Sequence, residues 1–322
     1  MKPILLTQGD PAGIGPEIAL RAFAEGDVTF VYLGSGDHLS ALAHPMGIAV
    51  HRMTALDESH DGALCVLDHP LAAPVIPGRP DPANAAATVE IIARAVEIAR
   101  SGAAAGVVTN PINKKALKDG AGFKFPGHTE YLGELCGVAR PVMMLASPEL
   151  RVVPVTIHIA LTEVPAALTP TLLEETLRTT AEALRDDFGI AAPRICVAGL
   201  NPHAGEGGAM GREELEVIAP VLDRLRAEGM TLDGPRSADT MFHPAARAHY
   251  DAAVCMFHDQ ALIPIKTVDF AGGVNVTLGL PIVRTSPDHG TAYDIAGKGV
   301  ADPRSLIAAL RLAREIAATR AA

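Results

Sequence analysis

Three histidines in this sequence could together hold a metal ion. His158, His203 and His258 each follow closely after an apolar run. Imidazole suits zinc and other divalent transition metals, and three protein ligands leave coordination positions open for a substrate. The three residues lie too far apart for one helical motif such as HExxH, so three loops would have to converge on the ion. The alternative is that they are separate loop or core histidines.

Four basic side chains could bind an anionic group of a substrate. Lys114 and Lys115 follow an apolar run, while Lys266 and Arg284 flank Asn275. A phosphate or carboxylate would use lysine as a point charge and arginine as a two-pronged donor. The alternative for each of them is an ordinary solvated cation.

Two short motifs precede predicted helices. In Gly-His-Thr-Glu at 127–130, Thr129 could cap a helix, or His128 and Thr129 could hydrogen-bond a substrate. The glycine-rich run at 9–17 could bind an anion at a helix N-terminus, or it could be a tight turn that needs glycine. It is not GxGxxG, and the chain has no GxxxxGK[ST], so neither a Rossmann dinucleotide site nor a P-loop is supported.

The elements that must position these residues alternate along the chain. We predict strands at 2–7, 28–33, 106–109, 151–157, 194–198 and 252–256. We predict helices at 16–24, 82–101, 129–136, 171–188, 212–228 and 305–319. This alternation favours α/β architecture with a largely parallel sheet. Sites in such sheets form beyond the carboxyl ends of the strands, so polar residues after five of the strands predict one shared cleft.

Composition excludes several classes of protein. The chain has 322 residues, which favours about two domains. A formal net charge of −10, with no basic run, argues against nucleic-acid binding. No stretch reads as a signal peptide or a membrane span. The four scattered cysteines form no CxxC pair and fit a reducing compartment, so we expect a cytoplasmic protein.

Taken together, the motifs resemble the 4-hydroxythreonine-4-phosphate dehydrogenase family of vitamin B6 biosynthesis. The matching stretches, in the family's order, are 7–17, 127–130, 199–208, 238–240, 258–260, 273–286 and 288–291. The resemblance implies two α/β/α domains of the isocitrate/isopropylmalate dehydrogenase-like type with a cleft between them. It also implies a homodimer whose active site lies at the subunit interface.

The resemblance also suggests how the domains divide the work. The first α/β domain, 1–135 plus 272–322, would contribute the cofactor site. The second, 136–271, would contribute the metal ligands and the dimer interface.

Family site residues carry over to matching positions of this chain. The implied ligands of a zinc, magnesium or cobalt ion are His158, His203 and His258. The implied substrate contacts are His128, Thr129, Lys266, Asn275 and Arg284. For the NAD or NADP cofactor we expect contacts at Gly13, Gly15, Asn110 and Asp288. The candidates for proton transfer are Lys266, Asp239 and Asp259, and the two aspartates are also candidates for orienting a ligating histidine.

The implied activity is a metal-dependent, NAD(P)-linked oxidation with decarboxylation. It would convert 4-phosphooxy-threonine to 3-amino-2-oxopropyl phosphate in pyridoxal phosphate biosynthesis. The stretch 266–273 departs from the family's usual pattern, so the same chemistry on D-threonate or D-erythronate 4-phosphate is an alternative. Further alternatives are a metal-dependent hydrolase or aldolase using the same histidines, and a non-catalytic anion-binding protein.

Overall fold

The computed structural model describes residues 2–26, 28–56 and 62–322, which form two compact units. Unit 1 comprises Met1–Pro141 and Leu280–Ala318, and unit 2 comprises Val142–Gly279 and Thr319–Ala322. The domain boundaries and domain roles expected from the sequence stay predictions.

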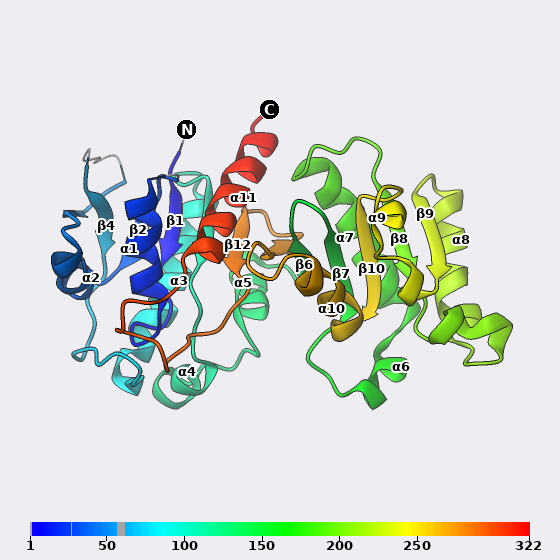
Figure 1. The fold of residues 1–322 in the computed structure, drawn as a ribbon, viewed down its shortest axis with the longest axis horizontal. Coiled ribbons are helices and arrows are strands. Elements are labelled where there is room, and N and C mark those ends of the chain that lie inside the picture. Colours follow the sequence, from blue (N-terminus) through cyan, green and yellow to red (C-terminus); the bar gives the residue numbers. More distant parts are fainter. Residues whose placement is uncertain (1, 27, 57–61) are drawn as a thin grey trace. The chain divides into compact units, whose positions relative to one another are not determined.

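Unit 1 is a parallel sheet flanked by helices (Figure 1). Its strands run in the order β3-β4-β2-β1-β5-β12, and every pairing is parallel. The strands are β1 (Ile4–Thr7), β2 (Val31–Gly34), β3 (Val50–Met53), β4 (Leu64–Asp68), β5 (Gly106–Thr109) and β12 (Arg284–Pro287). The helices are α1 (Gly15–Glu25), α2 (Gly36–Ala43), α3 (Ala85–Arg100), α4 (Lys114–Ala121), α5 (His128–Cys136) and α11 (Arg304–Arg320).

The core of unit 1 explains its continuous apolar strands. All residues of β1 and β5 are buried, as expected for parallel strands that are covered on both faces. Helix α3 packs Ile91, Ile92 and Val96 into the same core as Leu5 and Val107. Each such side chain contributes about 1.5–3 kcal/mol by leaving water. This burial holds the carboxyl ends of β1 and β5 side by side.

Unit 2 carries a mixed sheet in the order β11-β6-β7-β10-β8-β9. The β11–β6 and β6–β7 pairings are antiparallel and the others are parallel. The strands are β6 (Val142–Ala146), β7 (Arg151–Thr156), β8 (Arg194–Ala198), β9 (Thr231–Arg236), β10 (Ala252–Phe257) and β11 (Val274–Leu278). The helices are α6 (Val164–Ala167), α7 (Pro170–Asp186), α8 (Ala219–Ala227), α9 (Pro244–Arg247) and α10 (His258–Val268).

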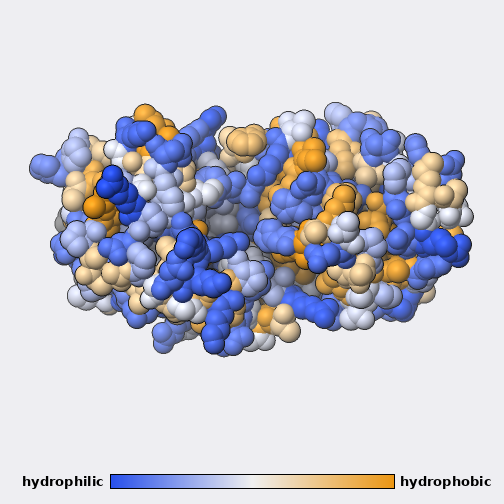
Figure 2. Space-filling view, turned by 90° about the horizontal axis from the view of Figure 1, so that it is seen from below, coloured by the Kyte–Doolittle hydropathy of each residue, from blue (hydrophilic) through white to orange (hydrophobic). Residues whose placement is uncertain are grey.

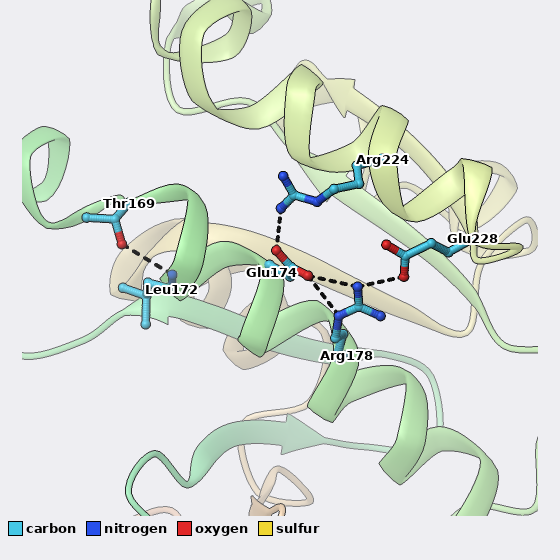
Figure 3. A network of polar contacts seen from close by, with 6 residues as sticks. All are labelled: Thr169, Leu172, Glu174, Arg178, Arg224 and Glu228. Carbon is cyan, nitrogen blue, oxygen red and sulfur yellow. Dashed lines mark hydrogen bonds and ion pairs between the residues drawn. The ribbon is translucent and has the colours of Figure 1, made fainter.

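Charged side chains connect α7 and α8 on the surface of unit 2 (Figure 3). The Thr169 hydroxyl caps the start of α7. Arg178 donates to Glu174 one turn earlier at 2.8 Å and to Glu228, just after α8, at 2.6 Å. Glu174 also pairs with Arg224 of α8. Exposed pairs of this kind contribute at most about 1 kcal/mol each, so the network adds little to the stability of unit 2.

The predicted α/β class is confirmed, and several individual elements differ from expectation. The predicted helix at 212–228 is a π-helical turn, Glu214–Ile218, followed by α8. The glycine-rich stretch around Asn275, which did not read as a strand, contains β11, because antiparallel pairing with β6 supplies its hydrogen bonds. No helix within the described residues is long and apolar enough to cross a membrane.

The five strands with polar ends are divided between the two units. Strands β1 and β5 belong to unit 1, while β7, β8 and β10 belong to unit 2. Within each unit these strands are parallel, so their carboxyl ends share one edge. That all five ends line a single cleft stays a prediction.

Candidate functional site

The three histidines follow three adjacent parallel strands of unit 2. Strand β10 lies between β7 and β8, and Phe257 at its end is paired with Thr156 at the end of β7. His258 therefore begins its helix between the loops that carry His158 and His203. This order could not be read from the sequence, where His203 lies between the other two.

His158 and His258 are direct neighbours. Their ring centroids lie 5.7 Å apart, with the rings tilted by 42°. His258 is the first residue of α10, and its Nδ1 lies 2.7 Å from Oδ1 of Asp259. A carboxylate at Nδ1 fixes the orientation of the ring and leaves Nε2 available to a ligand.

His203 belongs to a short left-handed turn. Five consecutive residues, 203–207, have φ values between 43° and 75°. His158 also has a positive φ, at 54°. A left-handed conformation costs roughly 1–2 kcal/mol for a residue with a Cβ, so the surrounding structure must hold these backbones in place.

Glu214 supplies much of that support. It is 3% exposed, and its Oε1 accepts the backbone N–H of Asn201 at 2.7 Å. Its Oε2 accepts the Asn201 side-chain amide at 3.0 Å, and Glu213 accepts the same amide at 2.7 Å. A Cβ at Gly205 would lie only 2.5 Å from Glu214 Oε2. The carboxylate thus fills the inside of the turn, which explains the glycine there.

The donor chemistry of the three histidines fits a divalent metal ion. Imidazole favours zinc or cobalt, whereas magnesium prefers oxygen ligands. Within the described part of this single chain, no group of three or more His, Cys, Asp or Glu side chains is placed to hold a metal ion. The chain by itself brings two of the three histidines together, and the metal role of all three stays a prediction.

The other predicted residues of unit 2 are spread over three segments. Lys266 lies on α10, two turns after His258, with its Nζ 5.8 Å from the Phe270 ring centroid. Asn275 lies on β11, and its Oδ1 is buried without a hydrogen-bond partner. Asp239 is exposed on the loop after β9 and accepts a hydrogen bond from Ser237. No contact of Asp239 with the histidines is seen among the described residues.

A basic cluster forms at the polar edge of unit 1. His128 begins α5, with Thr129 beside it in the same first turn. Its Nε2 is buried without a hydrogen-bond partner, although the residue as a whole keeps some exposure. The pKa of His128 lies well below its usual value. Burial is the larger cause, and the positive charges of Arg284 and Lys114 lower the pKa further. A neutral imidazole beside two cations is suited to an anion that brings compensating charge.

Arg284 is the most deeply buried cation of this cluster. It is 3% exposed at the start of β12, and its Nη2 donates to Thr109 Oγ1 at 2.7 Å. Burial lowers its pKa to about 10, while the charge of Glu130 acts in the opposite direction. A buried guanidinium strongly favours an anionic partner.

Lys114 was one of the four cations that could bind an anion, but it was not among the residues expected to contact the substrate. It is the first residue of α4, which is capped by the side chain of Asn113. A Cβ at Gly127 would lie 3.5 Å from Lys114 Cε, an ordinary contact distance, so the lysine side chain packs beside the start of α5. The local pattern that could have indicated Lys114 is a lysine that directly follows an Asn helix cap after the end of a strand. For Glu214 no comparable local signal existed.

The glycine-rich run is explained by close packing. A Cβ at Gly13 would lie 2.9 Å from the Thr291 carbonyl oxygen, and one at Gly15 would lie 2.7 Å from that of Gln8. Asn110 is fully buried and donates to the Gly15 carbonyl at 3.3 Å, leaving its Oδ1 buried without a partner.

The neighbouring amides are already used within the chain. Ile14 N–H donates to Thr291, and Ala12 N–H donates to the side chain of Asp10. Asp288, the remaining residue expected at the cofactor, donates its backbone N–H to Ser305 Oγ at 3.4 Å. A cofactor role for the glycine run and Asp288 stays a prediction.

A buried acid lies beside this turn. Tyr293 donates to Asp10 Oδ2 at 2.6 Å. Burial raises the pKa of Asp10, and the hydrogen bonds from Tyr293 and Ala12 partly offset this. The pair ties the 288–300 loop to the glycine run.

Known proteins resemble this chain in sequence and in fold. A model of the family described as pyridoxal phosphate biosynthetic protein PdxA matches residues 27–313. The chain is 63% identical to a 4-hydroxythreonine-4-phosphate dehydrogenase of Paracoccus denitrificans, across 99% of each chain. It is 58% identical to the protein of the same name from Roseobacter denitrificans, across 98% of this chain and 97% of the relative. The crystal structure of 4-hydroxythreonine-4-phosphate dehydrogenase from Klebsiella pneumoniae superimposes with a TM-score of 0.91, at 38% identity and 98% coverage of both chains.

Proposed function

Because the chain belongs to the PdxA family of pyridoxal phosphate biosynthetic proteins, as its motifs predicted, we propose that it is a 4-hydroxythreonine-4-phosphate dehydrogenase. The observation that carries this proposal is the 63% identity over essentially the whole length of a relative with that name. The reaction oxidises the C3 hydroxyl of the phosphorylated substrate and reduces NAD or NADP by one hydride. The resulting β-keto acid loses CO₂, and a proton replaces the carboxylate to give 3-amino-2-oxopropyl phosphate.

The basic cluster of unit 1 supports phosphate recognition. His128, Thr129 and Arg284 contact the phosphate in this proposal, and Lys114 adds a positive charge nearby. Their support is the buried, unpartnered His128 Nε2 and the almost fully buried Arg284 guanidinium. A doubly charged phosphate would offset the cost of keeping these groups in a poorly solvated place.

The histidines of unit 2 are the proposed metal ligands. His158, His203 and His258 would hold a divalent ion, which would supply Lewis-acid polarisation of the substrate hydroxyl. Asp259 orients the His258 ring. Lys266 and Asn275 bind the remaining polar groups of the substrate. Lys266, Asp239 and Asp259 remain the candidates for proton transfer.

A homodimer with the site at its interface belongs to the same proposal. Large apolar side chains follow the two neighbouring histidines, with Leu161 68%, Ile263 63% and Phe270 82% exposed in the single chain. Figure 2 views the molecule from the side on which α6 and α10 lie in Figure 1, and apolar surface is visible over unit 2. A second copy would cover such surface and could complete a ligand set that one chain does not assemble. A monomer in sedimentation at micromolar concentration would contradict the dimer.

A substrate panel tests the function. The protein is assayed with 4-phosphooxy-threonine, D-threonate 4-phosphate and D-erythronate 4-phosphate, each with NAD and with NADP, before and after chelation. We expect nicotinamide reduction with 4-phosphooxy-threonine, its loss on chelation, and its return with Zn²⁺ or Co²⁺. His203→Ala should abolish the return, whereas His44→Ala, in the short turn after α2 of unit 1, should not.

Other outcomes point elsewhere. A preference for a sugar-acid phosphate would keep the chemistry and change the substrate. Turnover without nicotinamide reduction would favour the hydrolase or aldolase alternative. Activity that survives thorough chelation would remove the metal from the proposal. A cytoplasmic location is part of the proposal and is checked by fractionation.

A further inference from the structure

One side chain hydrogen-bonds to two of the histidine-bearing strand ends. Gln260 is the third residue of α10, two positions after His258. Its Oε1 accepts the backbone N–H of Met256, near the end of β10, at 2.7 Å. Its Nε2 donates to the carbonyl of Gly199, the residue that follows β8, at 2.8 Å. Gln260 thus joins the loop of His203 to the start of the His258 helix.

The contact reaches His203 through a close backbone approach. A Cβ on Gly199 would lie 2.8 Å from Ala204 Cα, so only glycine allows the left-handed turn to rest on this residue. Ala204 is the neighbour of His203. A shift of Gly199 therefore moves the backbone that carries His203.

A second hydrogen bond extends the connection to the third strand. Thr156 Oγ1, at the end of β7, donates to the carbonyl of Met256 at 2.7 Å. Met256 is fully buried, and both of its backbone polar groups are bound by side chains from this edge. The ends of β7, β10 and β8, which lie side by side in Figure 1, are thereby tied together at the point where each histidine loop begins.

We propose that Gln260 is a positioning residue that sets the His203 loop against His258 through its hydrogen bond to Gly199. The inference rests on the proposed metal role of these histidines. Groups that orient metal ligands typically change metal affinity by about 10- to 100-fold when removed. The competing explanation is a helix cap, because a glutamine at this position often accepts a backbone N–H from the residues before the helix.

The two halves of the glutamine amide separate these explanations. In Gln260→Glu the oxygen that accepts the Met256 N–H is kept, so a capping role survives. The Nε2 donor is replaced by an oxygen that faces the Gly199 carbonyl, so the connection to the His203 loop is lost. In Gln260→Met both hydrogen bonds are lost at similar side-chain length.

Binding of Co²⁺ to the metal-free, full-length protein is the measurement. It is followed by the visible absorption of the bound ion and by competition with a chelator, at about pH 8, where a glutamate is ionised. Melting temperature is recorded for every variant. We expect Gln260→Glu to melt close to wild type and to bind Co²⁺ at least about 10-fold more weakly, with a changed spectrum. Gln260→Met should lose affinity and also melt lower.

Asp251 provides a matched control, because it joins β10 and β8 at their opposite ends. Asp251 precedes β10, and its Oδ2 accepts the backbone N–H of Arg194, the first residue of β8, at 2.7 Å. It also pairs with the Arg194 guanidinium at 2.9 Å. Asp251→Ala should lower the melting temperature and leave Co²⁺ affinity unchanged.

The outcomes distinguish this inference from the proposed function. If wild type binds no Co²⁺, or if His203→Ala binds it as tightly as wild type, the metal site itself is wrong and the inference falls with it. A second outcome is that Co²⁺ binding depends on His203, while Gln260→Glu and Gln260→Met bind Co²⁺ with an affinity within about twofold of wild type. Such a change is far below the usual effect of an orienting group, so only the inference would be overturned. Gln260→Met provides that decision even if Gln260→Glu does not fold.

Discussion

Acidification should destabilise the protein through His128. Burial and the charges of Arg284 and Lys114 hold its pKa well below the usual value, so the folded protein keeps it neutral. In the unfolded chain the same histidine has the ordinary pKa of about 6.5. Below that pH the unfolded state binds a proton that the folded state does not, so the free energy of unfolding decreases as pH falls. The stability is fully present above the unfolded pKa and is lost below it.

The magnitude follows from linkage for one group. Between about pH 7.5 and about pH 5.5 we expect His128 to remove about 1.4 kcal/mol from the free energy of unfolding. His128→Gln should lack this component, so its stability should fall less steeply than that of wild type. The control is His44→Gln, an exposed histidine in the same unit, which should follow the wild-type slope.

Urea unfolding monitored by circular dichroism at three pH values, at one protein concentration, measures the difference. Nuclear magnetic resonance of the His128 ring provides an independent reading of its protonation. Equal pH dependence in wild type and His128→Gln, or a ring that titrates at the ordinary histidine value, would refute the buried, neutral imidazole.

Three further substitutions test other parts of the structure. Arg284→Lys keeps the charge but loses the planar two-pronged donor, so kcat/KM with the phosphorylated substrate should fall roughly 10- to 100-fold; an unchanged value would exclude a direct phosphate contact. Glu214→Ala removes both hydrogen bonds to Asn201 and should lower the free energy of unfolding, measured in urea, by about 3 kcal/mol. A change below about 0.5 kcal/mol would show that the left-handed turn is stable without Glu214. Arg320→Met removes the ion-pair partner, at 2.5 Å, of the Asp187 carboxylate, which is only 3% exposed. It should lower the free energy of unfolding by about 3–5 kcal/mol. A variant as stable as wild type in the same urea experiment would show that the pair is dispensable.

Local pattern predicted the α/β class and six of the strands, but it did not predict β3, β4, β6, β9, β11 and β12. Strands such as 106–109 and 194–198 coincide with β5 and β8, because buried parallel strands are continuous apolar runs. Helix α3 follows from apolar residues at helical spacing, although its first turn begins at Ala85 and not at Pro82. Strand β11 was missed because its stability comes from pairing with β6, which is remote in the chain.

The sequence by itself determined the α/β class, the position of each histidine beyond an apolar strand, and membership of the family. These features depend on neighbouring residues or on long motifs, and both are visible in one dimension. Only the tertiary structure decided that β10 lies between β7 and β8, and hence that His258 neighbours His158.

Tertiary structure also decided that Lys114 and Arg284 act on His128, and that Gln260 reaches Gly199. The physical reason is that strand order and side-chain reach arise from contacts between segments distant in sequence. No local preference of the chain encodes those contacts.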